Sequence, residues 1–365
     1  GNEMSKRKTF FIVCGILCGV GMLLALTGRL LGGAVTGVGY EPGNGLVVYS
    51  PLVSNQPNGP SVQTDKIDQL EPFTRIDIRM DYADITIEES DHFSLEYELT
   101  AWEKPVISVK NGCLTISQPP HNYGNNRFFL FGSSFSGTVY NSWNSSREYL
   151  TVYIPENTQL DTVYVSTSSG KTELSGLKTG QLTIDNDYGD ARLTDITCTS
   201  ADFSLSSGKF TADNLKAESL KLSDDYGDCI LKNSEISGNT TLFLSSGTLK
   251  MQQSSTGALT VDSDYGNVDL NGITSENARL TLSSGDMKAE GFLFKNLDIK
   301  SDYGSVELVT QLTDSFGYDL KTDYGNIRIN KHDLGDTYYT FDKEFDNWVR
   351  IKCSSGDIRI TTQTD

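Results

Sequence analysis

The sequence has few of the residues from which active sites are built. Its three histidines, His92, His121 and His332, stand far apart, and it has no glycine-rich phosphate loop and no paired-cysteine motif. Carboxylates cluster only where a short motif repeats along the chain. Because an active site needs one asymmetric group of residues with different roles, the sequence predicts no enzyme activity and no cofactor.

Basic residues are also scarce. The chain has 30 lysines and arginines against 48 aspartates and glutamates, which gives a formal net charge of −18. Nucleic acids and anionic lipid surfaces attract basic proteins, so this charge argues against a nucleic-acid partner and against docking on an anionic membrane surface. An acidic domain outside the cell fits the composition.

The six cysteines do not predict a disulfide framework. Two lie in an apolar N-terminal run, and Cys113 and Cys198 have no visible partner. Cys229 and Cys353 lie six repeats apart in the repeated segment. At the usual strand spacing this separation is about 29 Å, which no disulfide spans, so we expect the four cysteines outside the run to be free.

A glycine-closed tripeptide, spelled either Ser-Ser-Gly or Asp-Tyr-Gly, recurs from residue 168 to residue 356. Its glycines are 19 residues apart up to Gly304, with one spacing of 20, and the last two spacings are 21 and 31. Such a period is typical of repeat proteins whose stacked units share one core. The glycines are Gly170, Gly189, Gly208, Gly227, Gly247, Gly266, Gly285, Gly304, Gly325 and Gly356.

Apolar residues alternate on both sides of each glycine. The residue five positions before the glycine is apolar in every unit, and nearly every residue two positions after it is apolar too. A period of two indicates β-strands, because helices place apolar residues three or four apart. Each unit thus carries two short strands that meet at a glycine corner. Stacked about 4.8 Å apart, such units predict an all-β fold, a single-stranded parallel β-helix or solenoid. The spacing gives about 19 residues per coil.

An uncharged run of twenty residues near the N-terminus follows three cations. In a helix it would reach about 30 Å, the thickness of the hydrocarbon core of a bilayer. The excess of cations before the run places the N-terminus inside the cell. A cleaved signal peptide is the alternative, but no small-x-small cleavage site follows the run. We predict a cytoplasmic N-terminus over residues 1–8, a single-pass transmembrane helix over residues 9–31, and a C-terminal domain outside the cell.

Segments without the period divide the rest of the chain. Residues 32–70 are rich in Gly, Pro, Asn and Ser and predict a flexible linker. Asp81-Tyr82-Ala83 has the flanks of the repeat with alanine in the glycine position, so the solenoid is expected over residues 71–365. Insertions interrupt it at about residues 88–147 and 331–348.

Both insertions are rich in aromatic residues. The first contains Asn111-Gly112, which predicts a β-hairpin. Its later part is interpreted as a lid over one end of the solenoid, or as a contact loop for a protein or cell-surface saccharide. The second insertion is the matching candidate for the other end. The candidate binding residues in the first are Phe128, Phe129, Phe131, Tyr140 and Trp143.

The approach to the first glycine corner carries a family resemblance. Ile154-Pro155 is followed by a polar turn and a strand that closes on Ser168-Ser169-Gly170, and glycine-centred coils follow. Together with the N-terminal run, this arrangement over roughly residues 73–365 resembles the bacterial putative-adhesin family of cell-envelope solenoids. The resemblance implies a role at the cell surface or envelope and transfers no catalytic residues.

The alternating tripeptides allow a structural and a metal-binding interpretation. Aspartates on every coil would lie about 4.8 Å apart and repel, whereas intervening serines double that spacing, donate hydroxyls and leave each tyrosine room to lie flat. Calcium is the alternative, because it binds six to eight oxygens and aspartates crowd two corners. The structural interpretation is favoured. The candidate metal ligands are Asp185, Asp187, Asp190, Asp224, Asp225 and Asp228.

These features predict a membrane-anchored, non-enzymatic solenoid that acts as an adhesin-like binding module at the cell surface. The alternative is an envelope scaffold or sensory partner of other membrane proteins. A calcium-binding surface repeat protein and a carbohydrate-active β-helix enzyme are less favoured.

Overall fold

The computed structural model describes residues 13–21, 23–24, 27, 37–41, 45–49, 61–101, 104–118, 128–131, 148–311, 316–340 and 344–362. The chain divides into two compact units. The smaller comprises Gly1–Ser61 and His121–Ser146, and the larger comprises Val62–Pro120 and Arg147–Asp365.

The smaller unit contains helical residues and a three-stranded antiparallel sheet. The helical residues are 13–21, 23–24 and 27. The sheet has the order β2-β1-β9, with strands β1 (Gly37–Glu41), β2 (Gly45–Tyr49) and β9 (Phe128–Phe131). No helix in the described part of the chain is long and apolar enough to cross a membrane, so it does not support the transmembrane helix predicted over residues 9–31.

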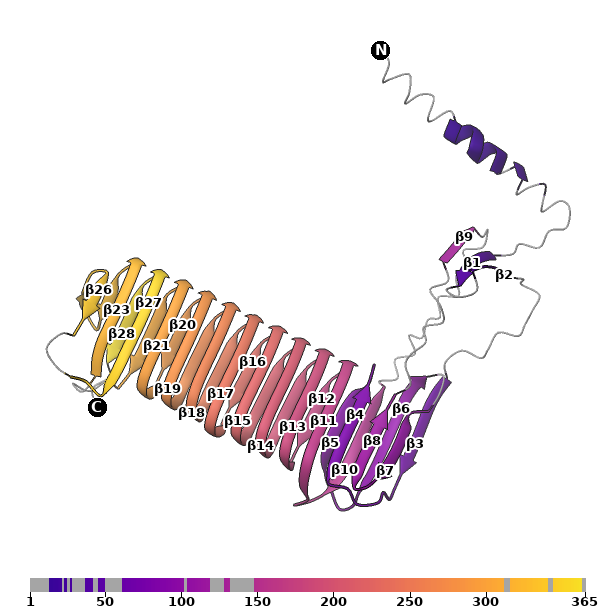
Figure 1. Cartoon of the computed structure of the whole chain (residues 1–365), viewed down its shortest axis with the longest axis horizontal. Helices are drawn as coiled ribbons and strands as arrows, with labels where there is room; N and C mark the ends of the chain where they lie inside the picture. The colour runs from indigo at the N-terminus through magenta and orange to yellow at the C-terminus, as the bar shows by residue number, and fades with distance from the viewer. Residues whose placement is uncertain are drawn as a thin grey trace, which may run out of the picture. The chain divides into compact units, whose positions relative to one another are not determined.

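The larger unit is a parallel β-solenoid, as predicted, in which successive coils lie side by side (Figure 1). Neighbouring coils pair in register at the offset of the repeat: Ala191 lies beside Phe210, and Ser207 lies beside Tyr226. The strands of this unit are β3 (Ser61–Ile67), β4 (Arg75–Met80), β5 (Asp84–Ser90), β6 (Ser94–Ala101), β7 (Val106–Lys110), β8 (Cys113–Ser117), β10 (Tyr149–Pro155), β11 (Gln159–Ser169), β12 (Thr172–Ser175), β13 (Lys178–Tyr188), β14 (Ala191–Ser207), β15 (Phe210–Tyr226), β16 (Cys229–Lys232), β17 (Glu235–Ser246), β18 (Leu249–Tyr265), β19 (Val268–Ser284), β20 (Met287–Glu290), β21 (Leu293–Tyr303), β22 (Val306–Thr310), β23 (Phe316–Tyr324), β24 (Ile327–Ile329), β25 (His332–Asp333), β26 (Thr337–Tyr339), β27 (Asn347–Ser355) and β28 (Ile358–Thr362).

The core is a continuous set of apolar side chains inside the coils. The residues five before and two after each repeat glycine are exposed by at most 1 % in all ten units. The inward faces predicted from the alternation are therefore confirmed. Along the axis of the solenoid a coil is only one strand thick. The coils on either side of it therefore help to bury each of these side chains.

A second corner, six residues after most of the glycines, is not predicted by the apolar pattern. There the backbone is left-handed, for example at Gly176 (φ 70°), Asn214 (φ 58°) and Gly272 (φ 64°). Glycine, asparagine and aspartate adopt this conformation at the lowest cost. Side chains join neighbouring corners, since Asn214 Nδ2 donates a hydrogen bond to Asp195 Oδ1 (2.6 Å).

At the N-terminal end, strands from the predicted insertion extend the stack. β4 and β5 pair in parallel with β11 and β12, and on their other side with β8 and β10. The β7–β8 hairpin turns at Asn111 (φ 51°) and Gly112 (φ 69°), as predicted. β3, which lies inside the predicted linker, pairs with β6.

At the C-terminal end, the order of coils in space differs from their order in the chain. β27 lies between β21 and β23 and is parallel to both, and β28 lies in the same way between β22 and β24. The last coil of the sequence is thus the second-to-last coil of the stack. Cys353 is consequently five coils from Cys229, one coil nearer than the sequence indicates.

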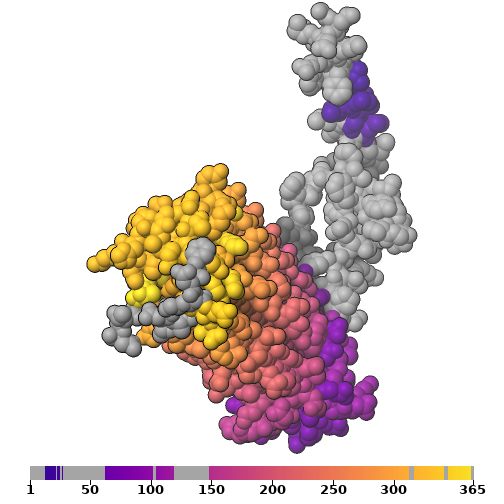
Figure 2. Space-filling view, turned by 60° about the vertical axis from the view of Figure 1, so that its left-hand side comes forward, coloured from indigo at the N-terminus to yellow at the C-terminus, as the bar shows by residue number. Residues whose placement is uncertain are grey.

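Short antiparallel strands cover the edge of the terminal coil. β25 pairs with β24, and β26 pairs with β23. Tyr338 packs on Tyr318 (ring centroids 6.0 Å apart), and Tyr339 stacks on Trp348 (5.9 Å). Figure 2 shows this C-terminal end, in yellow, turned toward the viewer. The second insertion therefore acts as an end cap, as predicted.

Candidate functional site

The Asp-Tyr-Gly corners place a row of exposed tyrosines along the solenoid. Four of them, Tyr188, Tyr226, Tyr265 and Tyr303, are exposed by between 67 and 69 %. The first and last members are exposed by 42 and 81 %. These six side chains are called the tyrosine row: Tyr82, Tyr188, Tyr226, Tyr265, Tyr303 and Tyr324.

Each tyrosine lies beside a serine of the neighbouring coil. Tyr226 is in register with Ser207 on one side and Ser246 on the other, and Tyr265 is in register with Ser246 and Ser284. Tyrosines therefore recur on every second coil, about 9.6 Å apart. That each tyrosine has room to lie flat stays a prediction, and about two thirds of each of the four central tyrosines is exposed to solvent.

The serines do supply hydroxyl donors to the aspartates, as predicted. Ser245 Oγ donates to Asp225 Oδ1 (3.3 Å), and Ser283 Oγ donates to Asp264 Oδ1 (3.4 Å). Each of these bonds joins an Asp-Tyr-Gly corner to the next Ser-Ser-Gly corner. Alternation thus replaces a carboxylate-to-carboxylate contact by a hydrogen bond.

The alternation is complete in the stack although it is broken in the chain. In the sequence, the Asp-Tyr-Gly of Gly304 is followed by another, that of Gly325. In the structure, Ser355 lies in register between Tyr303 and Tyr324, because the last coil is inserted there. The stacking order therefore keeps every pair of neighbouring tyrosines two coils apart at this end.

The same order holds at the other end. The coil of Tyr82 is followed in space by the coil of Ser169, whose N–H donates to the Asp81 carbonyl (2.7 Å). Many residues separate the two coils in the chain. The regular row is thus a property of the folded surface and not of sequence order alone.

The glycines allow the corners to approach one another closely. A Cβ on Gly189 would lie 2.0 Å from the carbonyl oxygen of Gly170, and the backbone there has φ 156°. The N–H of Gly189 donates to the carbonyl of Ser207 in the next coil (3.0 Å). Ala83 stands in the glycine position of its coil. The Gly170 corner approaches it on one side. On the other side the described neighbours of its coil are β8 and β10, and no glycine corner lies there among the described residues.

A buried polar side chain supports most Asp-Tyr-Gly corners from inside. Asn186 Nδ2 donates to the Gly170 carbonyl (3.2 Å), and Thr322 Oγ1 donates to the Gly356 carbonyl (2.8 Å). Both side chains are almost fully buried. These bonds satisfy carbonyl groups that face the interior at the corner.

Asp224 occupies this supporting position in one coil. Its side chain is fully buried, and neither carboxyl oxygen has a hydrogen-bond partner. It lies in register with Leu205 and Leu244 of the adjacent coils. Burial away from water, together with the charges of nearby Asp225 and Asp228, raises the pKa of Asp224 to about 7.

Two of the candidate metal ligands bind backbone groups of the next coil. Asp190 Oδ1 accepts the N–H of Lys209 (2.9 Å), and Asp228 Oδ1 accepts the N–H of Thr248 (2.8 Å). The same bond joins other coils, such as Asp286 to the N–H of Ser305 (2.8 Å). These carboxylates therefore have a structural role at the base of each corner.

The remaining candidate ligands do not converge on one point. Asp185 and Asp187 are exposed, Asp225 accepts a serine hydroxyl, and Asp224 points into the core. In the described ranges, no group of three or more His, Cys, Asp or Glu side chains is placed to hold a metal ion.

The predicted aromatic loop is described only in part. Phe128, Phe129 and Phe131 lie in β9 of the smaller unit, where β9 pairs with β1. Tyr140 and Trp143 lie outside the described residues. The tyrosine row was not predicted as a binding surface, although its six copies of Tyr before the corner residue are visible in the sequence.

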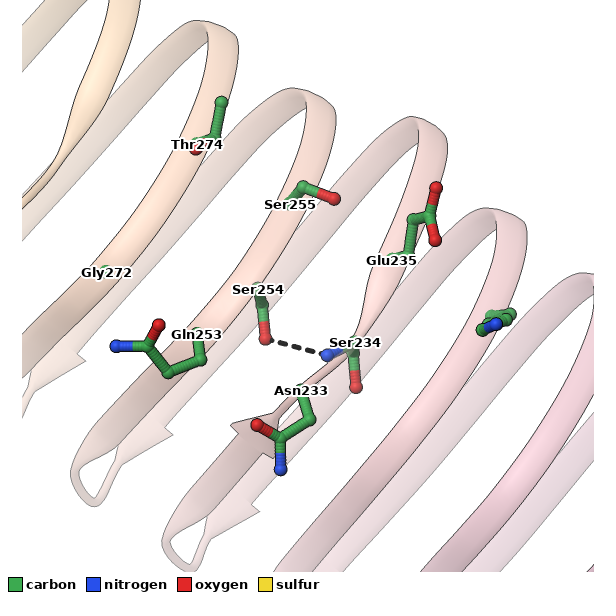
Figure 3. A pocket seen from close by; sticks show the side chains of 9 residues that line it. Asn233, Ser234, Glu235, Gln253, Ser254, Ser255, Gly272 and Thr274 are labelled. Atoms are coloured by element: carbon green, nitrogen blue, oxygen red, sulfur yellow. Dashed lines mark hydrogen bonds between the residues drawn. The ribbon is translucent and has the colours of Figure 1, made fainter.

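A polar hollow of about 330 Å³ lies at the second corner (Figure 3). Ser234 and Ser254 stand there in the column that holds Leu215 and Ile273 in neighbouring coils. The N–H of Ser234 donates to Ser254 Oγ (3.0 Å), and the N–H of Leu215 donates to Ser234 Oγ (3.1 Å). The two serine side chains in the hollow thus already accept hydrogen bonds from backbone N–H groups. The tyrosine row exposes larger side chains to solvent and is the better candidate for a ligand-binding surface.

One protein family, Toastrack DUF4097, has a model that matches residues 73–242 and 237–361 of the chain. No curated protein matches the chain significantly.

Several solved structures are similar to the chain. One is a putative lipid binding protein from Parabacteroides distasonis, with 15 % identity over 82 % of this chain and 96 % of that chain and a TM-score of 0.39. Another is a putative adhesin from Bacteroides fragilis, with 14 % identity over 83 % of this chain and 100 % of that chain and a TM-score of 0.32. A third is a putative adhesin from Parabacteroides distasonis, with 11 % identity over 83 % and 98 % and a TM-score of 0.34.

Proposed function

Because the chain belongs to the Toastrack DUF4097 family, whose model covers most of the solenoid, we propose that it is a non-enzymatic, adhesin-like binding module. The tyrosine row carries the proposal. Tyrosine offers a large, rigid, amphipathic contact surface at low conformational cost, and six such side chains are exposed at regular intervals. A surface of this kind recognises an extended partner along its length.

The charge around the row favours a neutral, hydroxyl-rich partner. An aspartate precedes each tyrosine, and the whole chain carries a net charge of −18. Polyanions would be repelled along the entire row. Carboxylates and serine hydroxyls instead accept and donate hydrogen bonds to sugar hydroxyls, while the aromatic rings pack against the apolar faces of sugar rings. The ligand we propose is therefore a cell-surface or cell-wall polysaccharide.

The repetition of the row supplies affinity from weak individual contacts. Each tyrosine with its neighbouring aspartate and serines forms a similar small contact site. A polymer that occupies several of these sites at once binds far more tightly than a single sugar, because later contacts form within the same complex. This mode of binding needs no deep pocket.

The acidic solenoid is placed outside the cell in this proposal, held by the apolar N-terminal run. That run follows three cations, which supports a cytoplasmic N-terminus. Six of its described helical side chains are large, apolar and exposed by 47 to 68 %. A reporter enzyme fused after residue 365 should be active only outside the cytoplasm, and activity inside it would refute this placement. The exposed apolar side chains are Val13, Ile16, Leu17, Val20, Leu23 and Leu24.

The test is binding of the full chain, purified in detergent, to purified cell-wall polysaccharides. We expect retention that falls by about tenfold or more when Tyr226 and Tyr265 are both replaced by serine, the residue of the intervening coils. Leu293→Ser, which removes a 44 % exposed apolar side chain elsewhere, is the matched control and should bind like the parent. Equal binding by the double tyrosine variant and the parent would refute the proposal and favour a scaffold or sensory role in the envelope.

A further inference from the structure

The spacing of the tyrosine row restricts which polymer can lie on it. Tyrosines occur on alternate coils, and from β13 to β27 a serine of the intervening coil is in register between each neighbouring pair. Adjacent coils are about 4.8 Å apart, so the tyrosines of alternate coils are about 9.6 Å apart. Equal exposure of the four central tyrosines indicates equivalent surroundings at each step.

The placement of the last coil shows how the spacing is kept. If coils stacked in chain order, Tyr303 and Tyr324 would lie on adjacent coils, about 4.8 Å apart. Insertion of β27 puts Ser355 between them and restores the two-coil step. The row thereby holds six tyrosines with five equal steps, a length of about 48 Å.

Polysaccharides differ in whether they can meet such a straight row. In an extended β-1,4-linked chain of pyranose rings, each ring is turned over relative to the one before it. The same ring face therefore recurs once in two rings, along a nearly straight line. An α-1,4-linked or β-1,3-linked chain winds into a helix instead, and its ring faces turn away from a straight row after one or two contacts.

We propose that the tyrosine row binds an extended, uncharged β-1,4-linked pyranose polymer, with one ring per coil. This inference rests on the proposed polysaccharide-binding function. Alternate rings stack on the tyrosines, and the turned-over rings lie above the Ser-Ser coils. The small serine side chains leave room for those rings, and the aspartates beside the tyrosines accept sugar hydroxyls and disfavour uronic acid polymers.

The experiment measures binding of the full chain in detergent to soluble oligosaccharides by calorimetry. Cellohexaose and the N-acetylglucosamine hexamer are the β-1,4-linked probes, and maltohexaose and laminarihexaose are the α-1,4-linked and β-1,3-linked comparisons. We expect at least one β-1,4-linked hexamer to bind about tenfold or more tightly than either comparison, and also more tightly than its own dimer.

Two variants separate this inference from the proposed function. Tyr265→Ser should weaken binding of the β-1,4-linked hexamer, because it removes one stacking ring and doubles the distance between successive tyrosines at that point. Ser246→Tyr adds a ring between Tyr226 and Tyr265, where it would block the turned-over sugar. It should weaken binding as well, although it increases the aromatic surface. Thermal melting checks that both variants fold.

The outcomes are distinct. Equal binding of maltohexaose or laminarihexaose, or tighter binding by Ser246→Tyr, would overturn the β-1,4 inference and leave polysaccharide binding by the row in place if Tyr265→Ser still weakens it. Absence of binding to every saccharide, or binding unaffected by Tyr265→Ser, would overturn both. If Ser246→Tyr fails to fold, the comparison of linkages with the parent chain decides the question alone.

Discussion

Asp224 and Leu205 lie opposite each other in neighbouring coils, and both side chains are buried inside the solenoid. A carboxyl group thus lies between the leucines of the two adjacent coils, Leu205 and Leu244. In the equivalent position of three other Asp-Tyr-Gly coils, Asn186, Ser301 and Thr322 donate a hydrogen bond to a corner carbonyl. An ionised Asp224 has no proton to donate, and its burial therefore couples folding to pH.

Stability of the parent should fall as the pH rises from about 4 to about 7. The pKa of Asp224 is raised in the folded state to about 7, so in this window the folded protein holds a proton that the unfolded chain has lost. Asp224→Asn should remove this slope and stabilise the protein at pH 8 by on the order of 2 to 4 kcal/mol. Urea unfolding at several pH values measures both effects. Asp262→Asn, at an exposed position of another coil, is the control, and identical pH slopes in parent and Asp224→Asn would contradict the prediction.

Leu222→Asp should unfold the solenoid. Leu222 is fully buried between Phe203 and Leu242 of the adjacent coils, so an aspartate there would find no polar partner. The cost is several kcal/mol. Circular dichroism and thermal melting would report the loss. Leu293→Asp at an exposed site should melt close to the parent, and an unchanged melting temperature for Leu222→Asp would mean that its side chain does not face the core.

Gly189→Ala should destabilise the protein by about 2 kcal/mol or more, because the added Cβ meets the carbonyl oxygen of Gly170 in the stacked corner. Gly335→Ala is the matched control. Its φ of 77° is also unfavourable for alanine, but no atom lies within 4 Å of the added Cβ. Chemical unfolding of the two variants compares the free energy lost when the Cβ clashes with the neighbouring coil with the free energy lost through backbone strain alone. Equal losses would show that the corners do not need close contact.

Calcium should not change the melting temperature of the parent. Asp190 and Asp228 already accept backbone N–H groups of the next coil, and the other corner aspartates point in different directions. Asp190→Asn keeps an oxygen acceptor for the N–H of Lys209 and should melt within a few degrees of the parent, with or without calcium. A rise of several degrees in millimolar calcium that chelator reverses, and that Asp190→Asn abolishes, would establish a metal site.

The sequence was sufficient to predict the coils and their core, because both depend on local patterns. The alternation around each glycine selects an inward face within a few residues, as Leu222 and Phe210 illustrate. The second corner left a weaker trace, since Gly176, Asn214 and Gly272 share a conformation but not a residue type.

The order of the terminal coils could not be predicted in the same way, because it depends on pairing between distant strands. The only trace in the sequence is the pair of successive Asp-Tyr-Gly corners at Gly304 and Gly325, which interrupts the alternation. Exposure of the tyrosines was also missed. Strand alternation would turn Asp187 and Tyr188 to opposite faces, but both are exposed because the chain turns at the corner.

The inserted C-terminal coil has a consequence for synthesis of the protein. A chain emerging from the ribosome can add its coils one by one up to β22, since each pairs with strands already made. The next segment, β23 and β24, can pair with its antiparallel cap strands β26 and β25, but its native parallel neighbours β27 and β28 are translated only later. If it docked early on β21, Asp302 and Asp323 would face each other about 4.8 Å apart, which disfavours that contact. We therefore expect the terminal coil to close only after β27 and β28 have been translated.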